Sequence, residues 1–463
     1  MNKILISFFF LFCCLSLSYG QTFYISSTEG ANDNDGLSEL TPKNDLRSVP
    51  KKGVTILLKR GDVFWGGISG YEDCTISYYG KGDRPVICGF KVLWNVDAWE
   101  AVGNNLWRLD LSNNDNFKGN IRLHYDAGNN NIGFIYDADK DKLYGRNVVG
   151  IDSLKNEMDF YTSPYYKSED VKNNPFKYVI VKSKGSPAKY GKLCFPMFQS
   201  GAQKMKNCKI KGLSFIGFSR MGMYDLNECE VDDCQIDLIG GGIQIGYRTR
   251  TRFGNGIELW YSCNNNIIKN CLISRTYDCA TTIQANGIIK YNPHNNLFIG
   301  NRIYKCRQAF EHFMNSSDGA EIKYEDCAFS NNICLFMGDN EFNSPEKRDC
   351  NILSYENKEK SLMINDNVFF GANHLDGNDI GEGMRGNRVY LYEDQYLYIC
   401  HWQPAKKTIM ANKRESITDY KALISDNSKI VVLKRGSWKA KRIERKYRKK
   451  VNWRPVDLHL ERL

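Results

Sequence analysis

The sequence predicts an all-β solenoid, a right-handed parallel β-helix with loop insertions and a basic C-terminal segment. Three observations lead to this fold class. A six-residue pattern recurs along the chain, its copies are spaced by about one solenoid coil, and short β-rich runs lie between them. A helical repeat would need apolar residues at 3.6-residue spacing over longer runs, and these runs are too short and too rich in β-branched residues.

The repeated pattern reads apolar, any residue, Asn/Asp/Gly, Cys/Asn/Leu, any residue, apolar. Asn or Asp at a bend accepts left-handed backbone or bonds it locally, so ladders of Asn side chains are expected there. The eight copies occupy residues 71–76, 210–215, 231–236, 268–273, 298–303, 324–329, 364–369 and 384–389.

From the second copy onward, the fourth positions follow one another at intervals of 21, 37, 30, 26, 40 and 20 residues. Intervals of about 20 to 30 suit one coil, and longer ones suit coils with inserted loops. We expect insertions around residues 100–200 and 340–360. The cysteines Cys234, Cys271 and Cys327 are expected to stack along one internal line as small apolar residues.

The first 20 residues have the features of a secretory signal peptide. Lys3 precedes the apolar stretch 4–17, which is short for a membrane span, and Ser18 and Gly20 are small residues ahead of Gln21. An N-terminal membrane anchor is the alternative. We expect a free protein that is secreted or periplasmic, with no transmembrane segment later in the chain.

The mature chain is expected to divide into a β-helix over residues 21–395 and a capping segment over residues 396–463. Between Lys434 and Arg454, eleven Lys or Arg stand against the single Glu444, and the whole chain has a net charge of +10. A nucleic-acid tail, a surface for an anionic glycan and a plain solvated face all fit this run. For an exported protein we expect a polysaccharide partner, no nucleic acid, and a monomer.

Metal-ligand patterns are weak. The chain has no C-x-x-C or H-E-x-x-H pattern and six scattered His, so a structural zinc site is not expected. Residues 32–36 read Asn-Asp-Asn-Asp-Gly, but Ala31 stands where an EF-hand loop has its first ligand, and no Glu lies at the twelfth position. We interpret this segment as a turn. No cofactor is assigned, and calcium is the metal left open.

Several further segments carry a family resemblance: Phe23-Tyr24-Ile25-Ser26-Ser27, Asn34-Asp35-Gly36, Thr41-Pro42, 56–62, Tyr79-Gly80, 84–87 and 255–284. With the repeats, they make residues 22–395 resemble the right-handed parallel β-helix (pectin-lyase-like) superfamily, and in particular its exported bacterial repeat proteins. Members include polysaccharide lyases, glycoside hydrolases, epimerases, phage depolymerases and non-catalytic adhesins, so the resemblance implies a fold more than a reaction. It transfers no catalytic residue, because neither the calcium-binding aspartates of pectate lyases nor the paired-aspartate strand motif of polygalacturonases is evident here.

Outward-facing residues on successive strands supply the catalytic candidates. Alternation of apolar and polar residues points Glu258, Thr282 and Glu311 outward on successive coils, with Trp260 and Gln284 beside them. Parallel strands lie about 4.8 Å apart, so the Cα atoms of Glu258 and Glu311 are expected about 9.6 Å apart. Inverting glycosidases hold their two carboxyls about 6.5–9.5 Å apart. The pair is therefore a candidate for glycoside hydrolysis, and a solvated or salt-bridged surface is the alternative.

A lyase acting on a uronate must neutralise the sugar carboxylate and remove the C5 proton. Candidates for the first role, among the basic residues of these coils, are Arg248, Arg275, Lys290 and Arg302. Tyr261 and His312 are candidate bases, although alternation points His312 inward, where a core histidine is the alternative. Asp278 is predicted either to orient a base or to hold a bend. Trp260 and Tyr261 are expected to stack on sugar rings.

The sequence thus predicts an exported carbohydrate-active protein, a polysaccharide lyase or glycoside hydrolase that acts on an acidic polysaccharide. The alternative is a non-catalytic solenoid for glycan binding or surface attachment, in which the same outward residues form a binding face.

Overall fold

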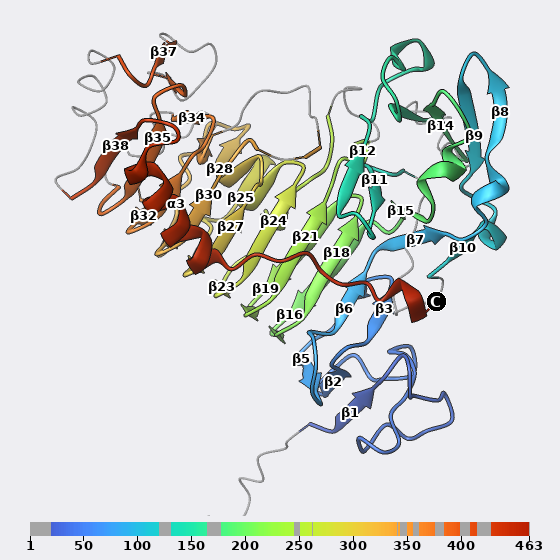
Figure 1. Cartoon of the computed structure of the whole chain (residues 1–463). Helices are drawn as coiled ribbons and strands as arrows, with labels where there is room; N and C mark the ends of the chain where they lie inside the picture. The colour runs from blue at the N-terminus through green and yellow to red at the C-terminus, as the bar shows by residue number, and fades with distance from the viewer. Residues whose placement is uncertain are drawn as a thin grey trace, which may run out of the picture.

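Strands from successive coils stack side by side along one axis in the computed structural model of the chain (Figure 1). This parallel β-helix confirms the predicted fold class. The structure describes residues 20–119, 131–163, 177–244, 251–261, 263–339, 341–342, 350–354, 361–375, 384–398, 408–413 and 427–462.

Three parallel sheets form the faces of the β-helix, and they are numbered here in the order in which a coil visits them. Sheet 1 consists of β1 (Thr22–Ile25), β2 (Thr55–Lys59), β5 (Thr75–Tyr79), β17 (Lys209–Lys211), β20 (Glu230–Asp232), β23 (Ile267–Lys269), β26 (Leu297–Ile299), β29 (Ala328–Ser330) and β32 (Met363–Asn365). Sheet 2 consists of β3 (Val63–Trp65), β6 (Val86–Cys88), β18 (Ser214–Phe218), β21 (Gln235–Ile239), β24 (Leu272–Thr276), β27 (Arg302–Tyr304), β30 (Ile333–Leu335), β33 (Val368–Phe370), β35 (Arg388–Tyr392) and β38 (Lys429–Leu433). Sheet 3 consists of β4 (Ile68–Ser69), β16 (Ser200–Lys206), β19 (Met221–Asn227), β22 (Ile257–Trp260), β25 (Cys279–Gly287), β28 (Gln308–Ser316) and β31 (Ile352–Ser354).

The core is a set of vertical stacks of apolar side chains inside the coils. In sheet 1 the strand register aligns one buried residue from each of eight successive strands: Ile56, Ile76, Ile210, Val231, Ile268, Phe298, Phe329 and Ile364. Each fully buried side chain of this kind contributes roughly 1.5–3 kcal/mol to folding. The stacks join into one apolar cluster that runs along the β-helix.

The backbone confirms the predicted bends. The third position of every copy of the six-residue pattern has a positive φ, between 51° and 69°. These positions are Asp73, Gly212, Asp233, Asn270, Gly300, Asp326, Asp366 and Gly386. Asn and Asp tolerate left-handed backbone because their short polar side chains bond locally, and Gly because it has no Cβ.

The eight copies belong, however, to two different corners of the coil. Most lie between a strand of sheet 1 and a strand of sheet 2, as residues 268–273 do between β23 and β24. Copies 71–76 and 324–329 instead lie at the start of a sheet 1 strand. The interior stack that holds Cys234 and Cys271 therefore excludes Cys327, and the prediction of a single line through all three was wrong.

Both corners select the same residues because both need a left-handed bend with a small side chain pointing inward. The intervals of 26 and 40 residues mix the two corners. The copy that belongs between them is centred on Asn332, which lies 31 residues after Asn301 and 35 before Asn367.

The predicted ladder of Asn side chains is present at the corner between sheets 1 and 2. The backbone N–H of Asn301 donates to Oδ1 of Asn332 at 2.8 Å, that of Asn332 to Asn367 at 2.9 Å, and that of Asn367 to Asn387 at 3.0 Å. All four side chains are fully buried. The thirteen cysteines among the described residues are all buried.

The first predicted insertion forms a separate antiparallel body beside the first coils. One of its sheets contains β7 (Phe90–Leu93), β10 (Phe117–Lys118), β11 (Ile135–Asp137), β12 (Lys142–Tyr144) and β15 (Leu193–Pro196). The other contains β8 (Glu100–Gly103), β9 (Leu106–Asp110), β13 (Phe160–Ser163) and β14 (Tyr178–Lys182). The second predicted insertion, at residues 340–360, lies largely outside the described residues.

The C-terminal part extends sheet 2 and then covers its outer face. β38 lies beyond residue 395, the predicted end of the β-helix, and pairs in parallel with β35. Helix α3 (Trp438–Val451) packs against this sheet, and the chain after it runs back along the coils (red in Figure 1) until Arg462 reaches the carbonyl of Gly61. The basic segment thus flanks the sheet along its length.

A small three-stranded sheet of β34 (His374–Leu375), β36 (Tyr396–Tyr398) and β37 (Thr408–Met410) lies near the last coils. No helix in the described ranges is long and apolar enough to cross a membrane.

Candidate active site

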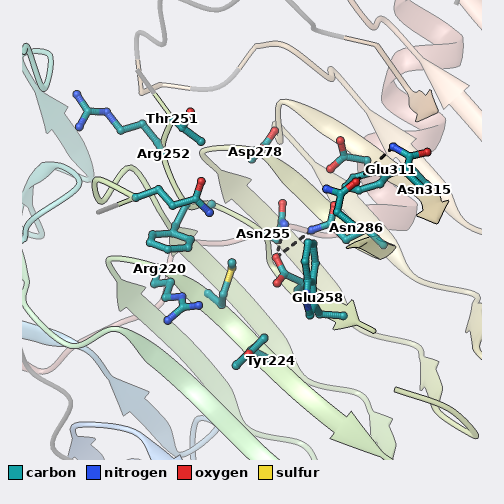
Figure 2. A pocket seen from close by; sticks show the side chains of 17 residues that line it. Arg220, Tyr224, Thr251, Arg252, Asn255, Glu258, Asp278, Asn286, Glu311 and Asn315 are labelled. Carbon is teal, nitrogen blue, oxygen red and sulfur yellow. Dashed lines mark hydrogen bonds between the residues drawn. The ribbon is translucent and has the colours of Figure 1, made fainter. Parts of the chain in front are cut away.

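A pocket of about 790 Å³ opens on the outer face of sheet 3 (Figure 2). Strands β19, β22, β25 and β28 form its floor. It is lined by Arg220, Met221, Tyr224, Gln244, Thr251, Arg252, Phe253, Gly254, Asn255, Glu258, Trp260, Asp278, Gln284, Asn286, Glu311, Phe313 and Asn315. Five residues predicted from the sequence are among them: Glu258, Trp260, Asp278, Gln284 and Glu311.

The strand register explains why these side chains meet. Glu258 of β22 pairs with Thr282 of β25, and Thr282 pairs with Glu311 of β28. The two glutamates therefore lie two strands apart, about 9.6 Å between Cα atoms at ordinary strand spacing. In the neighbouring row, Trp260 pairs with Gln284. The predicted outward arrangement on three successive coils is confirmed.

Glu258 is a buried carboxyl held by two amides. Its Oε2 accepts hydrogen bonds from Nδ2 of Asn255 at 2.7 Å and from Nε2 of Gln284 at 3.1 Å. Burial raises the pKa of Glu258 to about 7; the charge of Asp278 adds to this, and the two amides and the Arg220 guanidinium oppose it. A carboxyl with this pKa exchanges its proton near neutral pH, as general acid–base catalysis requires.

Glu311 is also buried. Burial raises the pKa of Glu311 well above its ordinary value, and the negative charge of Asp278 raises it further, while the Arg307 guanidinium lowers it. Nη1 of Arg307 lies 3.6 Å from Oδ1 of Asp278. Cys279 Sγ lies 3.7 Å from Oε2 of Glu311 and 2.8 Å from Oε1 of Gln308. Burial therefore favours the protonated form of Glu311, the form in which a carboxyl can act as a general acid.

Aromatic rings border the carboxyls. The rings of Trp260 and Phe313 meet edge to face at 6.5 Å, and Phe313 extends the row of Trp260 and Gln284 onto the next strand. On the opposite side, the Arg220 guanidinium lies over the rings of Phe253 and Tyr224, 4.4 and 5.3 Å from their centroids. Such faces can stack on the apolar side of a pyranose.

Three predicted substrate-binding residues lie away from the pocket. Arg275 is fully buried on the outer side of sheet 2, where it pairs with Asp237. Arg302 donates to the carbonyls of Asn270 and Val451, the latter at the end of α3. These two arginines support the C-terminal segment because that segment covers the outer face of sheet 2. Lys290 is exposed in the loop after β25.

The other predicted residues have these positions. Tyr261 lies beside the pocket, its ring 6.4 Å from that of Trp260, and donates its hydroxyl to the carbonyl of Ile288. His312 points inward, as alternation indicated, and its ring stacks at 5.7 Å on Phe310 inside the coil. Arg248 lies outside the described residues.

Twelve of the seventeen lining residues were not predicted from the sequence, and three of them bear on Glu258. Tyr224 pairs with Glu258 across β19 and β22, so the repeat register would have found it had β19 been recognised as a strand of the same sheet. Asn255 precedes β22 by two residues and reaches Glu258 because the chain bends there. Arg220 lies in the turn between β18 and β19, where no repeat predicts the direction of a side chain.

Metal-ligand groups do not converge in the described part of the pocket. Among the described residues, one set of three such side chains does converge, Asp457, His459 and Glu461 at the C-terminal end, and its carboxylates are exposed. Residues 32–36 form the predicted turn, in which Asp35 accepts from Leu37 and Thr41. Calcium therefore stays an open prediction.

No protein-family model and no curated protein matches the sequence. Solved structures resemble it weakly. A complex of XylC with xylose matches at TM-score 0.44 with 11% identity, over 94% of this chain and 81% of that one. A structure described as a glycoside hydrolase matches at TM-score 0.40 with 9% identity, over 91% of this chain and 98% of that one. A GH136 lacto-N-biosidase from Eubacterium ramulus matches at TM-score 0.36 with 11% identity, over 89% of this chain and 68% of that one. Likeness at this level assigns no reaction to this chain.

Proposed function

We propose that this protein is a carbohydrate-active enzyme that hydrolyses glycosidic bonds of an acidic polysaccharide, with Glu311 as general acid and Glu258 as general base. The observation that carries this proposal is a pair of buried carboxyls, two strands apart on one face of the β-helix, that line the same open pocket. Buried carboxyls with raised pKa values are uncommon on a solvated surface and typical of catalytic sites.

In the proposed reaction, Glu311 gives its proton to the glycosidic oxygen as the bond from that oxygen to the anomeric carbon breaks. A water molecule attacks the same carbon from the opposite face and passes a proton to Glu258. The expected Cα separation of about 9.6 Å is close to the upper limit of the carboxyl spacing in inverting enzymes, about 6.5–9.5 Å. We therefore expect inversion at the anomeric carbon.

Elimination is the second candidate reaction, and Arg220 and Tyr224 favour it because they would supply a cation and a phenol to a uronate. It is the weaker candidate for two reasons. Burial raises the pKa of Tyr224, which makes it a poor base at neutral pH. The predicted base His312 points into the core and does not line the pocket.

A panel of uronate-containing and neutral polysaccharides tests the proposal. We expect new reducing ends without absorbance from unsaturated products, and a fall in kcat of about 10²- to 10⁴-fold in Glu258→Gln and in Glu311→Gln. Glu230→Gln, a glutamate on sheet 1 that pairs with Lys209 and Lys269, is the matched control and should keep full activity. Unsaturated products would indicate a lyase. Binding without any cleavage would indicate the non-catalytic alternative.

We also propose that the protein is exported through its N-terminal signal peptide and acts as a monomer outside the cytoplasm. The described residues begin at residue 20, so this part of the proposal rests on the sequence. Cell fractionation with N-terminal sequencing tests it, and a mature chain that begins at Gln21 is the expected result.

A further inference from the structure

A second, smaller cavity of about 220 Å³ adjoins the pocket, and the two share Arg220 and Phe253 as lining residues. The polar side chains around this cavity include those of Asn131, Gln199 and Ser219. Arg220 thus stands at the junction between the catalytic carboxyls and a small polar recess.

Arg220 is half-buried, and it differs from the buried Arg275 and Arg307 in having no carboxylate partner in the described part of the chain. Arg275 pairs with Asp237, and Arg307 lies within ion-pair distance of Asp278. Across the described residues, Arg220 makes no ion pair, and its Nε is buried without a hydrogen-bond partner. Leaving a buried donor unpaired costs free energy, so such a group in a pocket wall points to a ligand that completes it.

The described side chains around Arg220 contact its guanidinium through aromatic rings and accept no hydrogen bond from its N–H groups. The guanidinium lies over the rings of Phe253 and Tyr224, and these rings stabilise a cation without accepting a conventional hydrogen bond from its N–H groups. Its charge acts on Glu258, yet no contact of 4 Å or less joins the two among the described residues. The available N–H fork therefore suits an anion from outside the protein.

The recess has few other donors to offer. The Asn131 amide already exchanges two hydrogen bonds with the backbone of Ile243, and the Ser219 hydroxyl donates to the carbonyl of Phe198. Gln199 makes no side-chain hydrogen bond to any described residue. Arg220 and Gln199 are thus the two polar residues of the recess for which the described part of the chain shows no side-chain hydrogen bond.

We infer that the recess is the subsite for the carboxylate of a uronic acid unit next to the scissile bond, and that Arg220 sets the preference for a uronate over a neutral sugar. This inference rests on the proposed function, since it names the charged group of the proposed substrate. A carboxylate is planar and accepts two parallel N–H bonds from a guanidinium, which an uncharged hydroxymethyl group cannot do.

Binding measurements in an inactive background test this inference apart from catalysis. Titration calorimetry with the Glu311→Gln variant would use tetrasaccharides of galacturonate, glucuronate and mannuronate, each beside its carboxyl-reduced counterpart. We expect at least one uronate to bind roughly ten- to hundredfold more tightly than its reduced form, as the loss of a charged hydrogen-bonded pair predicts.

Adding Arg220→Gln should remove that preference, and Arg220→Lys, which keeps the charge without the fork, should keep part of it. Arg302→Gln, on sheet 2 outside the pocket, is the matched control and should keep all of it. Thermal melts establish that each variant is folded. The inference is overturned if no uronate binds more tightly than its reduced form, or if Arg220→Gln leaves the preference intact. If the preference depends on Arg220 but the wild-type protein cleaves none of these glycans, the subsite stands and the proposed hydrolysis is wrong.

Discussion

Nε2 of Gln284 lies 3.1 Å from Oε2 of Glu258, although the two residues are 26 positions apart in the sequence. They meet because β22 and β25 are neighbours in sheet 3, one residue on each of two successive coils. The contact places an amide donor on a carboxyl that burial would otherwise keep protonated. The β-helix thus sets the proton affinity of Glu258 through a neighbouring coil.

Removing this amide should change the pH dependence of catalysis. Because the hydrogen bond lowers the pKa of Glu258, Gln284→Leu is expected to shift the acidic limb of kcat/KM to higher pH. Asn286→Ala is the control, since Asn286 lines the same pocket and accepts its hydrogen bond from Asn315. Equal shifts in both variants would show that the limb does not report the Glu258–Gln284 contact.

The wild-type pH profile follows from the two glutamates. A general base must be ionised, so kcat/KM should rise as pH increases through about 7, the pKa of Glu258. At higher pH it should fall as Glu311 loses the proton that it donates. The two apparent values belong to the coupled pair. Initial rates over the pH range measure this, and a limb near 7 that persists in residual Glu258→Gln activity would rule out Glu258 as the base.

Glu258 should also make the fold less stable at alkaline pH. A Glu in the unfolded chain titrates near about 4.3, so between about 4.3 and about 7 the folded state binds more protons than the unfolded state. Stability is then full below this window and falls as pH rises through it, by an upper limit of about 3–4 kcal/mol.

Glu258→Gln should flatten that loss, measured by urea unfolding at about pH 5 and about pH 8. Glu230→Gln is the control. Its effect on the pH dependence of stability should have the opposite sign, because Lys269 and Lys209 lower the pKa of Glu230. An unchanged pH dependence in Glu258→Gln would mean that this carboxyl is equally easy to ionise in both states.

Arg275 is predicted to stabilise the fold without binding substrate. Both it and Asp237 have fully buried side chains, so Arg275→Ala would leave a buried carboxylate without its partner and cost about 3–5 kcal/mol. Asp237→Asn combined with Arg275→Met should be much less harmful. Denaturant unfolding measures the loss. A variant of normal stability with a raised KM would instead restore the sequence-based assignment of Arg275 to the substrate.

Substituting an Asn of the ladder should lower the stability of the fold. Oδ1 of Asn367 accepts from the backbone N–H of Asn332 at 2.9 Å, and its Nδ2 donates to the carbonyl of Phe329. Asn367→Ala leaves both buried groups unsatisfied, at about 1–3 kcal/mol each. Asn114→Ala, which removes an exposed contact to Lys91, should change unfolding by less than about 0.5 kcal/mol. Equal losses in the two variants would contradict a structural role for the ladder.

Much of the candidate site followed from strand alternation. Glu258, Gln284 and Glu311 could be predicted because each lies inside a strand whose apolar neighbours fix its direction. Arg220 and Asn255 could not, because turn residues have no such period. Cys327 was misplaced for a related reason. Two corners of one coil need the same small residue at a left-handed bend, and a repeat in the sequence does not say which corner it marks.

The sequence by itself determined the coil: which residues face the interior, where the backbone bends, and that distant strands come into register. Only the tertiary structure decided which outward faces stay open. Arg275 faces outward, yet Asp141 of the insertion, 134 residues away, and Trp453 of the C-terminal segment cover it, whereas no such cover closes the described part of the pocket over Glu258. The physical reason is that alternation reports the direction of a side chain within its own coil, while burial outside the coil depends on segments that fold back from elsewhere in the chain.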